Sequence, residues 1–113
     1  MHELAIAEEI GAIVLARLKE HSMKKVTALK LEFGEMTSVV PEALDFAFTS
    51  VAKGTAMEGA KLSIKIIKVR AKCLNCGNIY RVKDIDYTCP KCKENLHEII
   101  EGRDMIVKTI EME

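Results

Sequence analysis

Hydrophobic residues recur at helical spacing in two stretches of the chain. The first stretch runs from about Leu4 to Glu20, with its charged residues mainly on the opposite side. Its apolar stripe comprises Ile6, Ile10 and Ile13, with Val14 and Leu18 beside it. The second stretch begins near Pro41, which suits the first turn of a helix, and ends near Gly54. Its apolar stripe comprises Leu44, Phe48 and Val51, supported by Ala47, so the pattern predicts two amphipathic helices.

Three further stretches alternate between apolar and polar residues, which is typical of half-buried strands. They are Val26 to Phe33, Leu62 to Val69 and Asp104 to Met112. The first two strands and the helix between them can form one crossover unit. We therefore predict an α+β fold in which two helices cover one face of a small mixed three-stranded sheet.

Four cysteines interrupt this pattern before the last strand. Cys73 and Cys76 form one pair, Cys89 and Cys92 form another, and twelve residues separate the pairs. A pair with two intervening residues makes a tight turn that aims both thiolates at one point, and two such knuckles complete a tetrahedron. The spacing predicts an inserted zinc-ribbon module that holds structural Zn(II), with iron on the same ligands as the minor alternative.

Other roles for these cysteines fit the sequence less well. A redox pair is expected at a strand-to-helix junction and would not be duplicated. A catalytic zinc needs an open coordination position, and four thiolates leave none. We also find no catalytic triad, paired-carboxylate signature or phosphate loop, so the chain is not expected to be an enzyme.

The net charge and the length of the chain limit the classes of partner that the protein is expected to bind. The 113 residues include 17 basic and 17 acidic side chains, whereas nucleic-acid binders usually carry a basic excess. No secretory signal precedes the first helix, and no apolar run is long enough to span a bilayer. We therefore expect a cytoplasmic protein without a nucleic-acid or membrane partner, in which cysteines are metal ligands rather than disulfides.

The first three residues offer a second metal site. Met1, His2 and Glu3 place a terminal amine, backbone amides and an imidazole next to one another. Such nitrogen donors can close adjacent chelate rings in a plane, which suits Ni(II) or Cu(II) better than tetrahedral Zn(II). The alternative is that His2 follows the initiator methionine by accident.

These features occur together in one order. Met1-His2-Glu3, the following helix, the Phe33-Gly34-Glu35 turn, the cysteine pairs and Gly102-Arg103 before a terminal strand span almost the whole chain. In that order and length the sequence resembles the HypA family of hydrogenase nickel-insertion proteins. The resemblance implies a metallochaperone that works with a partner GTPase and passes nickel to the immature large subunit of nickel–iron hydrogenase. Some bacterial relatives also serve urease.

The resemblance also implies where the metals bind. Nickel is expected at His2 and Glu3, including main-chain nitrogens, with the Met1 amine as a further candidate. Zinc is expected at the four cysteines. The nickel-binding domain would comprise residues 1–70, completed by the strand in 100–113, and the inserted zinc-binding domain residues 71–99. Whether the protein forms a homodimer is left open.

This chain departs from certain relatives beside the cysteine pairs. Those relatives carry a histidine next to each pair, whereas this chain has Gly77-Asn78 and Lys93-Glu94. His97 is the one histidine near the module, and we expect it to lie on the surface rather than to bind nickel. The competing hypothesis is a zinc-ribbon interaction module, for protein or nucleic acid, without a nickel role.

Overall fold

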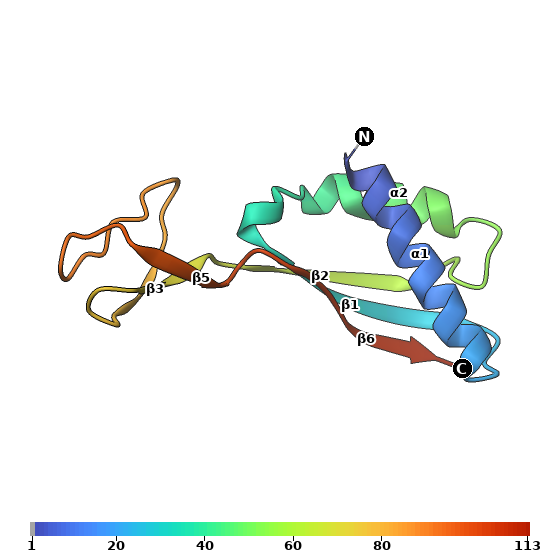
Figure 1. The fold of residues 1–113 in the computed structure, drawn as a ribbon. Helices are drawn as coiled ribbons and strands as arrows, with labels where there is room; N and C mark the ends of the chain where they lie inside the picture. The colour runs from blue at the N-terminus through green and yellow to red at the C-terminus, as the bar shows by residue number, and fades with distance from the viewer. Residues whose placement is uncertain (1) are drawn as a thin grey trace. The chain divides into compact units, whose positions relative to one another are not determined.

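The computed structural model describes residues 2–113 (Figure 1). The elements are α1 (His2–Glu20), β1 (Val26–Gly34), the short 3-10 helix η1 (Glu35–Thr37), α2 (Pro41–Ala52), β2 (Lys61–Ile67), β3 (Arg70–Cys73), β4 (Ile79–Arg81), β5 (His97–Glu101) and β6 (Met105–Met112). Two helices and two three-stranded sheets confirm the predicted α+β class. The two predicted helices and the three predicted strands are all present, with ends shifted by a few residues. No helix of the described residues has the length and apolarity needed to cross a membrane.

The chain forms two compact units. The first unit comprises the residues up to Glu32, Val39–Lys65 and Ile106–Glu113. The second unit comprises Phe33–Ser38 and Ile66–Met105, and therefore contains all four cysteines. Because β1 and β2 lead out of the first unit and β6 returns to it, the second unit is an insertion that also recruits the turn after β1.

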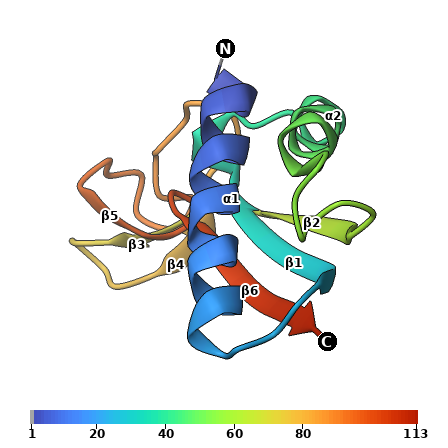
Figure 2. The ribbon, with the colours of Figure 1, turned by 90° about the vertical axis from the view of Figure 1, so that its right-hand side faces the viewer.

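The sheet of the first unit has the order β2-β1-β6. Strand β6 runs antiparallel to β1, because Glu113 donates its amide to Lys25 at one end while Gly34 donates to Asp104 at the other. In Figure 1 the colour sequence shows β1 and β2 running in the same direction, with α2 as the crossover between them. Figure 2 shows α1 beside α2 above this sheet, so the sheet is mixed and helix-covered on one face, as predicted.

Side chains from α1, α2 and β1 fill the core of the first unit. Fully or nearly fully buried members are Ala7, Ile10, Val14, Leu18, Val26, Leu29, Leu31, Leu44 and Phe48. The predicted stripe of α1 was partly wrong, because Ile13 is 38% exposed and Ala7 is buried instead. At Gly11, one turn further along α1, an added Cβ would lie 3.2 Å from Val51 of α2, so small residues of α1 face inward, and hydrophobicity alone gives such residues little weight.

The second unit has its own sheet, with the order β4-β3-β5 and antiparallel pairing on both sides of β3. Its core is a small cluster that comprises Val69, Ala71, Cys73, Tyr80, Val82 and Cys89. The Tyr80 hydroxyl donates a hydrogen bond to the Tyr87 carbonyl at 2.5 Å, and a tight turn joins Lys83 to Asp86. Two of the six core residues are cysteines, so two of the candidate metal ligands are also core side chains.

Two glycines meet where β1 ends and β6 approaches. A Cβ added to Gly34 would lie 2.1 Å from the backbone carbonyl of Gly102, although Gly34 itself has an ordinary extended conformation. Gly102 has φ of +98° and packs against the backbone of Val69. The role of Gly34 is therefore close backbone contact rather than unusual torsion angles.

Replacing Gly34 with alanine should destabilise the protein strongly. Backbone cannot yield as a flexible side chain does, so we expect a loss of about 3 kcal/mol or more in the free energy of unfolding, at the upper end of overpacking effects. Chemical denaturation of the zinc-loaded protein measures this loss. Gly54→Ala is the control, because its φ is +78° but no atom lies within 4 Å of the added Cβ. Equal losses in the two variants would contradict the steric account.

Candidate metal sites

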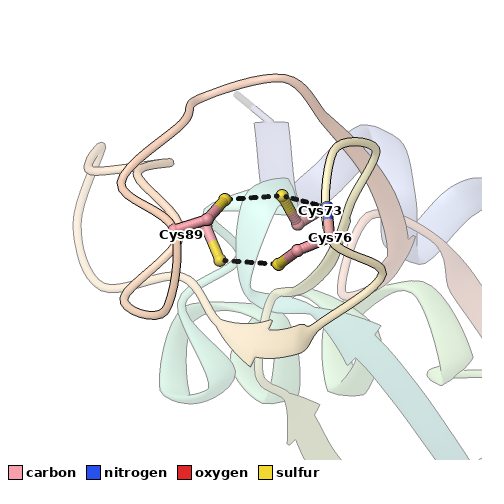
Figure 3. Close-up of side chains that lie close together, drawn as sticks. Cys73, Cys76 and Cys89 are labelled. Carbon is pink, nitrogen blue, oxygen red and sulfur yellow. Dashed lines mark hydrogen bonds between the residues drawn. The ribbon is translucent and has the colours of Figure 1, made fainter.

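The four cysteine sulfurs converge in the second unit. All four Sγ atoms lie within 4.8 Å of one another. The Sγ atoms of Cys73 and Cys92 are 3.5 Å apart, and those of Cys76 and Cys89 are 3.7 Å apart. Figure 3 shows Cys73, Cys76 and Cys89 pointing toward one another. A tetrahedron with metal–sulfur bonds of about 2.3 Å has sulfur–sulfur edges of roughly 3.8 Å, so the cluster fits zinc.

The two knuckles repeat one hydrogen-bond pattern. In the first, the Cys73 carbonyl accepts from the Gly77 amide at 2.9 Å, and the Cys73 amide donates to Asn78 at 2.8 Å. In the second, Cys89 makes the equivalent bonds with Lys93 at 2.9 Å and with Glu94 at 2.8 Å. Gly77 has φ of +78° and Lys93 has φ of +69°. Both turns thus need a left-handed residue after the second cysteine, and only the first uses glycine for it.

The local environment shifts the pKa values of three of the four cysteines, and the shifts differ in direction. The Asn78 backbone lowers the pKa of Cys76, but desolvation and the neighbouring thiols outweigh it and raise that pKa to about 11. Desolvation raises the pKa of Cys89, but hydrogen bonds from backbone amides of its own knuckle and from the Asn78 side chain bring it down to about 6. The Asn75 side chain is the main group that lowers the pKa of Cys92. The pKa is thus raised at Cys76 and lowered at Cys89 and Cys92.

The amino-terminal residues lie in the first unit, at the start of α1. The His2 side chain is half exposed, and its Nδ1 lies 3.3 Å from Oε2 of Glu3. The same Glu3 oxygen accepts a hydrogen bond from the Val40 amide at 3.2 Å. Val40 is the residue that precedes the first turn of α2. Glu3 thus connects the imidazole to the start of the second helix, while the Met1 amine lies outside the described residues.

The Glu3 carboxylate is held in its charged form. The Val40 amide is the largest cause of its lowered pKa, followed by the Glu3 amide, with His2 adding a smaller effect. The first amide groups of a helix have no intrahelical carbonyl partner, so the amides near His2 are free of the helical ladder. The site can therefore offer an imidazole and main-chain nitrogens that are not donors in helical hydrogen bonds.

Replacing Glu3 with glutamine should remove one acid-sensitive contribution to stability. A carboxylate with a lowered pKa stabilises the fold above its unfolded value, near 4.5, and loses that contribution as pH falls through the folded value. The difference in unfolding free energy between parent and Glu3→Gln should thus be constant near neutral pH and shrink below about pH 4.5. Urea titrations across pH measure it, with the exposed carboxylate of Glu9 as the control in Glu9→Gln. A difference that is unchanged at pH 3 would contradict the assignment.

The remaining candidate ligands do not join either group. His97 lies in the second unit, stacked on Tyr87 at a centroid distance of 4.6 Å, with Nδ1 2.7 Å from the Asn95 carbonyl oxygen. His21 is exposed just after α1. Among residues 2–113, the four cysteines form the one group of three or more metal-binding side chains. The sequence did not predict the contact of Glu3 with Val40, because it joins residues far apart in the chain.

Comparison with known proteins agrees with this arrangement. The family model described as hydrogenase/urease nickel incorporation, metallochaperone, hypA matches residues 1–112. Hydrogenase maturation factor HypA of Desulfitobacterium hafniense strain DSM 10664 / DCB-2 is 33% identical over 113 residues, covering 100% of this chain and 99% of the relative. That of Methanocaldococcus jannaschii is 36% identical over 121 residues, covering 100% and 98%.

A solved structure has the same fold. The solution structure of the Ni metallochaperone HypA from Helicobacter pylori matches with a TM-score of 0.71 and 24% identity, covering 99% of this chain and 97% of that one. At this identity the likeness concerns the fold alone. A small α+β chain with a tetrathiolate cluster and a whole-length match of this kind is a metallochaperone, not an enzyme. The chain belongs to the HypA family, whose members act in hydrogenase maturation, and the resemblance noted from the residues is confirmed.

Proposed function

We propose that the protein binds Ni(II) at its amino terminus and, with a partner GTPase, delivers it to the immature large subunit of nickel–iron hydrogenase. The single observation that carries this proposal is the family match over residues 1–112. The His2 imidazole supports it, because it is accessible at the start of α1 and is oriented by the neighbouring carboxylate. The hypothesis of an interaction module without nickel has no comparable support.

The proposed nickel ligands are the His2 imidazole, its main-chain nitrogen and that of Glu3, with the Met1 amine as a further donor. Two consecutive backbone nitrogens that bind one ion close a chelate ring containing the ψ angle between them, which is near −42° in a helix. Nickel binding should therefore adjust the backbone of the first turn of α1. A site at a chain terminus can make this change while the core of the first unit stays packed, so it can release its ion again.

Zinc has a different role in this proposal. The residues that hold it are Cys73, Cys76, Cys89 and Cys92, which lie partly in the core of the second unit. Bound there, the ion would cross-link the two knuckles, and four thiolates leave no open coordination position. We assign nickel binding to residues 1–70 with 100–113, and zinc binding to residues 71–99.

Delivery can be tested with purified components. Zinc-loaded protein carrying one equivalent of nickel is mixed with the partner GTPase, GTP and the nickel-free large subunit, which is then separated and analysed for metal. We expect nickel to appear on the large subunit faster than from the same concentration of free Ni(II), and to depend on the GTPase. Transfer no faster than from free Ni(II) would rule out the delivery function.

A further inference from the structure

Hydrogen bonds within each knuckle come from its own backbone. The Cys76 amide donates to the Cys73 sulfur at 3.5 Å, and the Lys93 amide donates to the Cys89 carbonyl at 2.9 Å. Such bonds stabilise each turn separately, since both partners belong to the same short loop. They do nothing to hold one knuckle against the other.

One asparagine side chain of the first knuckle, that of Asn78, reaches across to the second knuckle. Nδ2 of Asn78 donates to the Cys89 sulfur at 3.7 Å, while the Asn78 carbonyl accepts from the Cys73 amide at 2.8 Å. The half-buried Asn78 is thus hydrogen-bonded to one cysteine of each knuckle.

We propose that Asn78 is a positioning residue of the zinc site, which clamps the Cys89 sulfur of the second knuckle against the first and so slows loss of the metal. The proposal rests on the zinc role proposed above. Four thiolates around a divalent ion carry a net charge of −2, and a donor hydrogen bond to one sulfur stabilises that charge. A neutral amide supplies the donor without adding charge to the site, whereas a carboxylate at position 78 would add a negative one.

Release of zinc from the full chain tests the clamp. Zinc-loaded parent, Asn78→Leu, Asn78→Asp and Asn78→His are each mixed with an excess of the chromogenic chelator 4-(2-pyridylazo)resorcinol. Loss of an outer-shell partner typically weakens metal binding by roughly 10–100-fold, so the leucine variant should release zinc at least about tenfold faster. The aspartate variant should release it faster still, and histidine, which keeps an N–H donor, should recover part of the retention.

Two controls separate the clamp from a purely structural role. Asn95→Asp makes the same chemical change as Asn78→Asp, but at an exposed position of the module whose described side chain makes no hydrogen bond to a sulfur. This variant should release zinc at the rate of the parent. In Co(II)-loaded protein, the thiolate-to-metal charge-transfer band should shift in Asn78→Leu but not in Asn95→Asp. Equal release rates and unshifted bands in folded Asn78 variants would overturn the clamp alone. A parent chain that holds no zinc would overturn the zinc assignment as well.

Discussion

Replacing His2 with alanine should abolish specific nickel binding while leaving the zinc content unchanged. The imidazole is the one side-chain nitrogen in the proposed ligand set, whereas the main-chain amide nitrogens must lose protons before they bind. Loss of an outer-shell partner costs roughly 10–100-fold in metal affinity, so loss of this direct ligand should exceed that range. Titration of tag-free, zinc-loaded protein with Ni(II), followed by absorption spectroscopy, measures the change.

The matched control is an alanine at His21. This histidine is also exposed and lies just after the other end of the same helix, so His21→Ala removes an imidazole without touching the proposed site. Its nickel titration should coincide with that of the parent. If His2→Ala retains the parent affinity, or if His21→Ala loses it equally, nickel binds elsewhere and the proposed ligand set is wrong.

Replacing Cys89 with serine should remove zinc and unfold the second unit while the first unit keeps its fold. Cys89 is fully buried in a core of six residues, so the substitution removes a metal ligand and a core side chain together. Small metal-dependent modules of this kind lose their structure when the metal is absent. The first unit has its own core, built from α1, α2 and β1, and does not depend on the cysteines.

Amide NMR spectra can report the two units separately. In Cys89→Ser, signals from Arg70–Cys73 and His97–Glu101 should collapse toward random-coil positions, whereas those from Pro41–Ala52 should keep their dispersion. Thr88→Ser is the control at the neighbouring position, because Thr88 makes its described hydrogen bond through its backbone amide. Zinc retention with an intact second unit in Cys89→Ser would contradict the structural role of the metal.

Sequence predicted the cluster of four cysteines because its signal is local. Two residues between paired cysteines set the turn geometry, and the structure brings all four sulfurs within 4.8 Å as that spacing requires. The helices of the first unit were predictable for the same reason, since periodicity is a local property. Which face of α1 is buried was harder to predict. Ala7 rather than Ile13 is buried, because packing within the whole first unit decides which face is covered.

The second sheet was not predictable from pattern. Strand β3 has four residues and β4 has three, which is too short for alternation to be recognised. Strand β3 pairs with β5 through Cys73 and His97, with the whole cysteine segment between them in sequence. The hydrogen bond between Glu3 and Val40 could not be predicted for a related reason, because its partners are 37 positions apart in the sequence. Each missed feature depends on non-local contacts that a single sequence does not display.

The central claim, that the amino terminus itself carries the nickel, is tested most directly by blocking that terminus. A Gly-Ser extension before Met1 leaves every side chain in place but displaces the terminal amine from the proposed chelate. The extended, zinc-loaded protein should fail to bind Ni(II) in a titration in which the parent binds one ion per chain with a planar-type spectrum. Unchanged nickel binding by the extended protein would contradict the account, and the nickel site would then have to be sought among other residues.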